Sequence, residues 1–201
     1  MLLLIAACVL SSGAGSTLLA QPEPDSVSLL LAAASRDTSQ TDFLIEYAWK
    51  IYEANPDGAA RLLDAAIESA RRLSAVREEA KAYNAYGAVE EIRGNLTAAK
   101  RRYSQALALR RTLANNEEIG STLNNLGVLS EMMGRHDSAI VYHRENLRIQ
   151  QQRHDTARIA RALFNLAGAY QESALYNEAQ THLQEARLIL EARNDPDGTA
   201  K

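Results

Sequence analysis

Small and apolar residues recur along this chain with the spacing of an α-helix, and the whole pattern returns with a 40-residue period. Between residues 121 and 134 they stand three or four positions apart, which places them on one helix face. Nearly the same stretch begins at Lys81 and again at Arg161, one period before and one period after Ser121. A turn at Gly134 separates this stretch from a second helical pattern. Each 40-residue row therefore predicts two antiparallel helices of about 18 residues joined by a short turn.

Small residues also occupy equivalent positions in successive rows. One such set is Ala59, Ala99, Ala139 and Ala179, and another is Ala66, Ala106, Asn146 and Ala186. A third set lies inside the first helix of each row, at Gly87, Gly127 and Ala167. A glycine inside a helix costs up to ~1 kcal/mol relative to alanine. We therefore predict that the two helices of a row cross closely and that successive rows stack, because a single helix pair cannot bury its apolar faces alone.

The spacing of these residues resembles the tetratricopeptide repeat. Gly87 is followed by Ala99, Tyr103 and Ala106, and the third and fourth rows keep this spacing with Asn146 as one departure. The first row fits if Ala48 takes the glycine position one residue late. HEAT and armadillo repeats also have periods near ~40 residues, but they lack this spacing. The resemblance covers roughly residues 40–193 and implies an all-α, right-handed superhelical solenoid of antiparallel helix hairpins.

We divide the chain on this basis, with each range a prediction. The ranges are a signal peptide at 1–20, a linker and N-terminal capping helix at 21–39, repeats at 40–79, 80–119, 120–159 and 160–195, and the start of a truncated fifth repeat at 196–201. The capping helix would begin at Asp25. Leu188, Ile189 and Leu190 show no clear capping pattern. Either the chain is a fragment, or its fourth hairpin packs on a missing partner.

The segment 1–20 is apolar and rich in small residues, as in a secretory signal, although no Lys or Arg precedes the apolar run. It is shorter than a good membrane span, which needs ~20 apolar residues. We expect cleavage after Ala20, with a cut after Ala14 as the alternative. Cys8, the only cysteine, is either a small residue of the signal or the lipid-bearing residue of a lipoprotein box. The expected location is outside the cytoplasm, in a bacterial periplasm or cell envelope.

Composition and motifs favour binding over catalysis. The net charge is −3 and there is no basic run, so we expect no nucleic-acid partner. No phosphate loop or dinucleotide turn occurs. The four histidines lack metal-ligand spacing, and the acidic pairs Glu90–Glu91 and Glu117–Glu118 are assigned to solvated helix faces. We therefore predict no enzymatic activity, no cofactor and no metal.

The resemblance to tetratricopeptide repeats implies a groove lined by the first helix of each row. Three layers are projected onto it: Lys81, Asn84, Ala88 and Glu91; Ser121, Asn124, Val128 and Glu131; Arg161, Phe164, Gly168 and Gln171. Asn125 and Asn165 stand one position further along. Asparagine amides can donate to and accept from a peptide backbone together, but Asn125 and Asn165 could equally bind a neighbouring helix. The lysine–asparagine–arginine clamp for a terminal carboxylate is incomplete here.

From these layers we predict a peptide- or partner-binding site. Its residues are Lys81, Asn84, Glu91, Asn124, Asn125, Glu131, Arg161, Phe164 and Asn165. The expected function is a non-enzymatic protein–protein interaction scaffold whose repeats make no membrane contact. The alternative is the exported sensory region of a longer signalling protein with a histidine kinase, cyclase or transcriptional output. The sequence does not indicate an oligomeric state.

Overall fold

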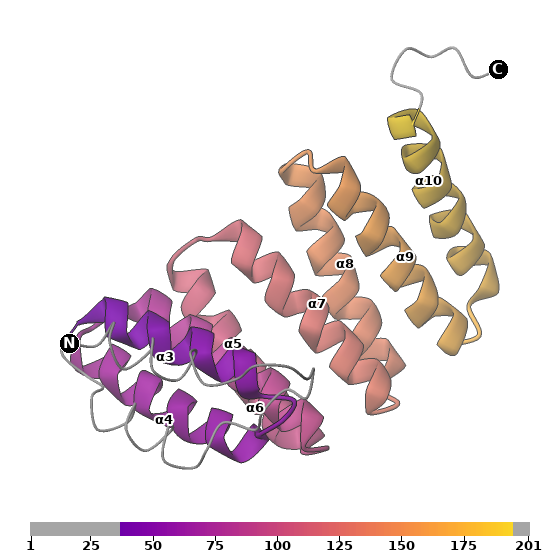
Figure 1. The fold of residues 1–201 in the computed structure, drawn as a ribbon. Helices are drawn as coiled ribbons and strands as arrows, with labels where there is room; N and C mark the ends of the chain where they lie inside the picture. The colour runs from indigo at the N-terminus through magenta and orange to yellow at the C-terminus, as the bar shows by residue number, and fades with distance from the viewer. Residues whose placement is uncertain (1–36, 195–201) are drawn as a thin grey trace, which may run out of the picture. The chain divides into compact units, whose positions relative to one another are not determined.

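A computed structural model describes residues 37–194, and in that range every regular element is a helix (Figure 1). The helices are α3 (Thr38–Ile51), α4 (Pro56–Arg72), α5 (Val76–Ile92), α6 (Leu96–Thr112), α7 (Asn116–Met132), α8 (His136–Gln152), α9 (Thr156–Glu172) and α10 (Tyr176–Asn194). The all-α class and the pairing of helices predicted from the 40-residue period are confirmed. The predicted signal peptide, the capping helix at Asp25 and the start of a fifth repeat lie outside the described residues.

The helices α5, α7 and α9 begin four residues before the ranges 80–119, 120–159 and 160–195. The period leaves open where one row ends and the next begins, since any starting point gives rows of equal length. The helix bounds show at which residue the first helix of each of these repeats begins. The predicted repeat ranges themselves stay a prediction. In the part of the chain that the structure describes, no helix is long and apolar enough to span a bilayer.

One turn geometry ends six successive helices, from α4 to α9. The residues with positive φ at these turns are Ser74, Gly94, Ala114, Gly134, His154 and Ala174. At the end of α7, for example, Gly134 N–H donates to the Glu131 carbonyl and Arg135 N–H to the Ser130 carbonyl, each at 2.8 Å. This pair of bonds is the Schellman motif, which satisfies the last carbonyls of a helix. The backbone turn thus occurs twice in each row, whereas the side-chain pattern occurs once.

Exchanging glycine and alanine at these turns should change stability in opposite directions. Ala114 has a φ of 51°, and Gly134 has a φ of 66° with no atom within 4 Å of where its Cβ would lie. We expect Ala114→Gly to raise the free energy of unfolding, and Gly134→Ala to lower it, by about 1 kcal/mol each. Urea denaturation followed by circular dichroism measures both. If neither exchange changed the midpoint, the left-handed turns would not contribute to stability.

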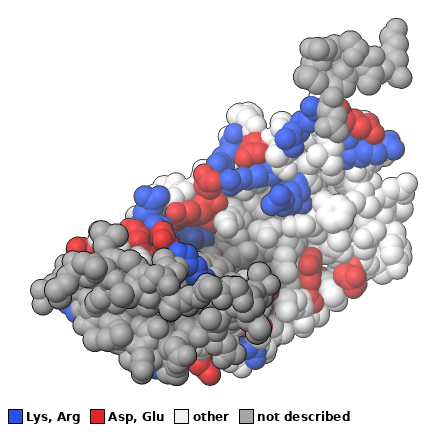
Figure 2. Space-filling model, viewed as in Figure 1, with Lys and Arg blue, Asp and Glu red and all other residues white. Residues whose placement is uncertain are grey.

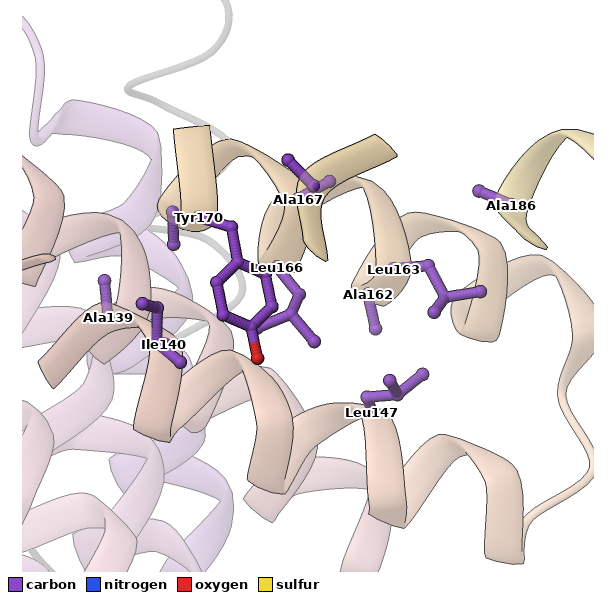
Figure 3. Packing of buried hydrophobic residues seen from close by; sticks show 11 residues of the cluster. Ala139, Ile140, Leu147, Ala162, Leu163, Leu166, Ala167, Tyr170 and Ala186 are labelled. Atoms are coloured by element: carbon purple, nitrogen blue, oxygen red, sulfur yellow. The ribbon is translucent and has the colours of Figure 1, made fainter. Parts of the chain in front are cut away.

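The described chain forms two compact units that divide within α6, between Arg102 and Tyr103. In the first unit α4 packs on both α3 and α5. In the second unit α7 packs on α8, α8 on α9, and α9 on α10, so each helix is followed by its neighbour in space (Figure 1). The core of this second unit joins Ile140 and Leu147 of α8 to Leu163 and Leu166 of α9 (Figure 3). All four of these side chains are at most 7% exposed.

The small residues at equivalent positions are buried, as the repeat requires. Ala59, Ala99 and Ala139 are fully buried and Ala179 is 1% exposed. Ala48, which was expected to take the glycine position of the first row, is also 1% exposed. Equivalent positions therefore lie at the same depth in every row, which confirms the prediction from the 40-residue period.

Gly127 shows why a glycine is needed inside a helix. A Cβ at this position would lie 2.3 Å from Cε1 and 2.6 Å from Nδ1 of His143, on the facing helix α8. His143 itself is fully buried. The imidazole therefore packs directly on the α7 backbone, and the predicted close crossing of the two helices of a row is confirmed at this pair.

Glu90 corrects one expectation from the sequence. It was assigned to a solvated helix face, but it is only 7% exposed. Its carboxylate accepts hydrogen bonds from Arg93, at 3.2 Å, and from Asn95 Nδ2, at 2.8 Å. A buried carboxylate needs such partners, so the acidic residue at the end of α5 ties the following turn to the helix.

Candidate functional site

In the first unit, the predicted site residues already have partners within the protein. Lys81 Nζ of α5 lies 2.8 Å from Asp42 Oδ1 of α3, which makes an ion pair between the first helices of two successive rows. Asn84 and Glu91 also interact within the chain. Lys81 and Asp42 are each about one-third exposed. A ligand that binds either side chain must therefore compete with the ion pair between them. Their predicted role in binding stays a prediction.

The second unit places two predicted asparagines in contact with each other. Asn165 Nδ2 of α9 donates to Asn124 Oδ1 of α7 at 2.7 Å. This bond links neighbouring first helices, which is one of the two roles that the sequence left open for Asn165. Each amide retains further donors or acceptors. Asn125 takes part in an interaction of its own within the chain.

Glu131 lies near the end of α7 and contacts a buried histidine. Its Oε1 is 3.2 Å from Nε2 of His143. Burial lowers the pKa of His143 to about 4, so the imidazole is neutral near pH 7. A carboxylate can only accept a hydrogen bond, so His143 carries its proton on Nε2 and donates it to Glu131. The Nδ1 atom of His143 has no hydrogen-bond partner among the described residues.

A pocket of about 240 Å³ opens beside this pair, at the ends of α7 and α9 and the start of α8. Its lining consists of Glu131, His136, Gly168, Gln171 and Glu172. Glu131, Gly168 and Gln171 belong to the groove layers that the sequence predicted. Because Gly168 lacks a side chain, nothing lies within 4 Å of where its Cβ would be. Glycine at this point keeps the pocket open.

Helix α9 presents a row of exposed side chains that leads to the pocket. Arg161 and Phe164 are both exposed, with Phe164 at 64% of its surface. They precede Gly168 by seven and four residues, so all three lie on one face of the helix. The three predicted residues Glu131, Arg161 and Phe164 therefore belong to one continuous surface. We call this surface, made of the α9 row, the pocket and Asn124, the α7–α9 face.

Two residues of the α7–α9 face were missed by the sequence analysis. His136 is one of the four histidines that were set aside because they lack metal-ligand spacing, and Glu172 was not singled out at all. Glu172 follows Arg161 by about three turns of helix, which returns it to the same face, so its spacing was the available signal. Nothing in the spacing of His136 identifies it, because a helix N-terminus enters the pocket only through tertiary packing. Among the described residues, no group of three or more His, Cys, Asp or Glu side chains could hold a metal ion.

The family comparison matches the model described as "Tetratricopeptide repeat" to residues 118–192. This range holds α7, α8 and α9 nearly complete and most of α10. Residues 118–192 are tetratricopeptide repeats. A comparison with curated protein sequences found no match. The resemblance drawn from the glycine–alanine spacing is thus confirmed.

Solved structures share the fold over most of the chain. BtubC (BKLC) from P. vanneervenii is 22% identical with a TM-score of 0.74, and the match covers 88% of this chain and 72% of that one. Aspartyl phosphate phosphatase F from Bacillus subtilis is 10% identical with a TM-score of 0.72, over 86% and 47%. A Rap protein complexed with competence and sporulation factor is 16% identical with a TM-score of 0.68, over 86% and 50%. At these identities the likeness extends to the fold alone.

Proposed function

We propose that the protein is a non-enzymatic scaffold for protein–protein interaction, and that its α7–α9 face binds an extended peptide or a partner helix. The observation that carries this proposal is Phe164, which is 64% exposed in the middle of the row that ends at the pocket. A large exposed aromatic beside a pocket is a typical anchor of a protein interface. The tetratricopeptide repeats and the Rap protein solved with its factor support the same reading.

The chemistry of the α7–α9 face suits a peptide. The amides of Asn124 and Asn165 are half-buried, and each keeps hydrogen-bonding capacity beyond the bond between them. Amides can pair with the donors and acceptors of a peptide backbone, while Phe164 offers apolar contact to a side chain. Such a surface binds a segment through its backbone and one or two anchors, without needing a reactive group.

Replacing Phe164 by alanine should weaken partner binding at least tenfold and leave stability nearly unchanged. The reason is that its ring is mostly exposed in the free protein, so truncation removes interface contact and little core contact. The matched control is Tyr176→Ala on α10, an aromatic of similar exposure, 67%, outside the α7–α9 face. Peptides selected from a random display library against the whole protein serve as ligands, and fluorescence anisotropy measures their affinity. If the control weakened binding and Phe164→Ala did not, this site would be wrong.

A second candidate function is the sensory region of a longer signalling protein, exported by residues 1–20. It is favoured by one structural neighbour, a signal transduction ATPase "with a tetratricopeptide repeat sensor" from Pyrococcus horikoshii. That match has a TM-score of 0.72 and covers 84% of this chain but only 27% of that protein. Reading the coding sequence beyond residue 201 tests the idea. A stop codon there in an intact gene would remove it, and a following membrane helix and output domain would support it.

A further inference from the structure

The pocket of the α7–α9 face is acidic, and its lining holds no lysine or arginine. Burial, and then the charge of Glu172, raise the pKa of Glu131, whereas His136 lowers it. The hydrogen bond from neutral His143 occupies one side of Glu131 and adds no positive charge. The carboxylates of half-buried Glu131 and exposed Glu172 therefore line one pocket in which His136 is the only basic side chain, and a bound cation relieves such an arrangement.

Both carboxylates stand at helix ends that do not favour them. Glu131 is in the last turn of α7, and Glu172 is the last residue of α9. The C-terminal end of a helix carries a partial negative charge, so basic residues are the stabilising choice there. Neither α7 nor α9 has a basic residue in its last turn, whereas α4 and α6 each have two arginines there. A positive group from outside would thus meet two carboxylates and two helix ends.

The size of the pocket suits a single side chain. Its volume of about 240 Å³ is below the ~300–1,000 Å³ of most small-molecule sites. The open space over Gly168 lets a planar group lie against the α9 backbone. A guanidinium is planar and can donate to two carboxylates in a fork, whereas an ammonium acts as a point charge. The geometry therefore favours arginine over lysine.

The opposite end of the α7–α9 face carries the opposite charge. Arg161 is exposed near the start of α9 and has no hydrogen bond or ion pair among the described residues. About three turns of helix separate it from Glu172, a distance of ~16 Å along the axis. An extended peptide covers that distance in about five residues. Figure 2 shows basic side chains together with acidic ones over the edge of the second unit where α9 begins, and acidic side chains on the edge where α7 and α9 end.

We propose that the pocket formed by Glu131, Gly168, Gln171 and Glu172 takes the guanidinium of an arginine from the bound partner segment. An acidic residue of that segment, about five positions away, pairs with Arg161 and fixes its direction along α9. This inference rests on the proposed function, since it names the chemistry of the segment that the α7–α9 face binds.

Nuclear magnetic resonance with a small probe tests the pocket itself. N-acetyl-arginine amide, titrated into the whole protein, should shift the amide signals of Gly168 and Gln171 in a saturable way. The same titration with N-acetyl-leucine amide should not. In the double variant Glu131→Gln and Glu172→Gln the affinity for the probe should fall at least tenfold. Glutamine at position 131 still accepts the hydrogen bond from His143, so the fold is kept. The matched control is Glu178→Gln on α10, an exposed glutamate outside the α7–α9 face, which should leave the shifts unchanged.

Peptides selected from the display library separate this inference from the proposed function. Selected peptides should carry arginine and an acidic residue about five positions apart, and the double variant should weaken them about tenfold. Reversing Arg161 to glutamate should favour peptides in which the acidic residue is replaced by lysine. If peptides bind at Phe164 without arginine and without loss in the double variant, the inference fails and the proposed function stands. If the library yields no binder at the α7–α9 face, both fail.

Discussion

Replacing Gly127 by alanine should lower the free energy of unfolding by about 2 kcal/mol. A Cβ there would lie 2.3 Å from the nearest atom of His143, and that imidazole is fully buried, so neither group has room to move. Gly168→Ala is the matched control, because this helical glycine has no neighbour within 4 Å of the Cβ position. There the exchange should raise stability by up to ~1 kcal/mol, as helix propensity predicts. Urea denaturation of the two variants gives the comparison.

The loss at Gly127 should be recovered by a second change on the facing helix. In the fourth row the equivalent positions are Ala167 and Leu183, and both belong to or pack against one buried cluster. Gly127→Ala combined with His143→Leu recreates that pair. We expect the double variant to be more stable than the sum of the single changes by at least ~1 kcal/mol, the coupling typical of residues in contact. Simple additivity would show that the two side chains do not compete for the same space.

Stability should fall as the pH drops from 6.5 to 4, and His143 should account for about 3 kcal/mol of that fall. Burial lowers the pKa of His143 to about 4 in the folded protein, against an ordinary value of 6.5 in the unfolded chain. Between these values the unfolded chain binds a proton that the folded protein does not, so acid favours unfolding. The contribution is complete above pH 6.5 and is lost progressively down to pH 4, below which it no longer changes.

Glu131 acts in the opposite direction in this range. Its pKa is raised in the folded protein, so the folded state gains a proton earlier than the unfolded chain as the pH falls. Comparing the slope of stability against pH between the wild type and His143→Leu isolates the histidine contribution. His154→Asn, which replaces a histidine in a turn, is the control and should keep the wild-type slope. An equal slope in wild type and His143→Leu would mean that His143 titrates normally and is not desolvated.

Local periodicity explains how much of the fold the sequence could predict. Small residues such as Ala99 and Ala139 recur at a fixed interval, which indicates stacked repeats. Within each repeat, the ~3.6 residues per helical turn determine which side chains share a helix face. The need for a small residue opposite a large side chain is also a local rule, since the separation of Gly127 from His143 recurs between Gly87 and Tyr103 and between Ala167 and Leu183. The helices, their turns and the buried alanines therefore followed from spacing, whereas the row of side chains on α9 was expected from the resemblance to tetratricopeptide repeats.

The tertiary structure decided which polar side chains meet. Lys81 pairs with Asp42 across 39 residues, and Asn165 pairs with Asn124 across 41 residues. Polar side chains of other lengths at these positions would give the same pattern of apolar and polar residues, so the pattern does not identify the pairs. Glu90 was expected in solvent and is buried. The spacing of Glu172 places it on the exposed face of α9, but its meeting with Glu131 in one pocket depends on how α7 and α9 pack. The period of a repeat is set by backbone geometry and the packing of small residues. The partners of a polar side chain depend on rotamers and on the distance between neighbouring helices, which appear only once the helices have packed.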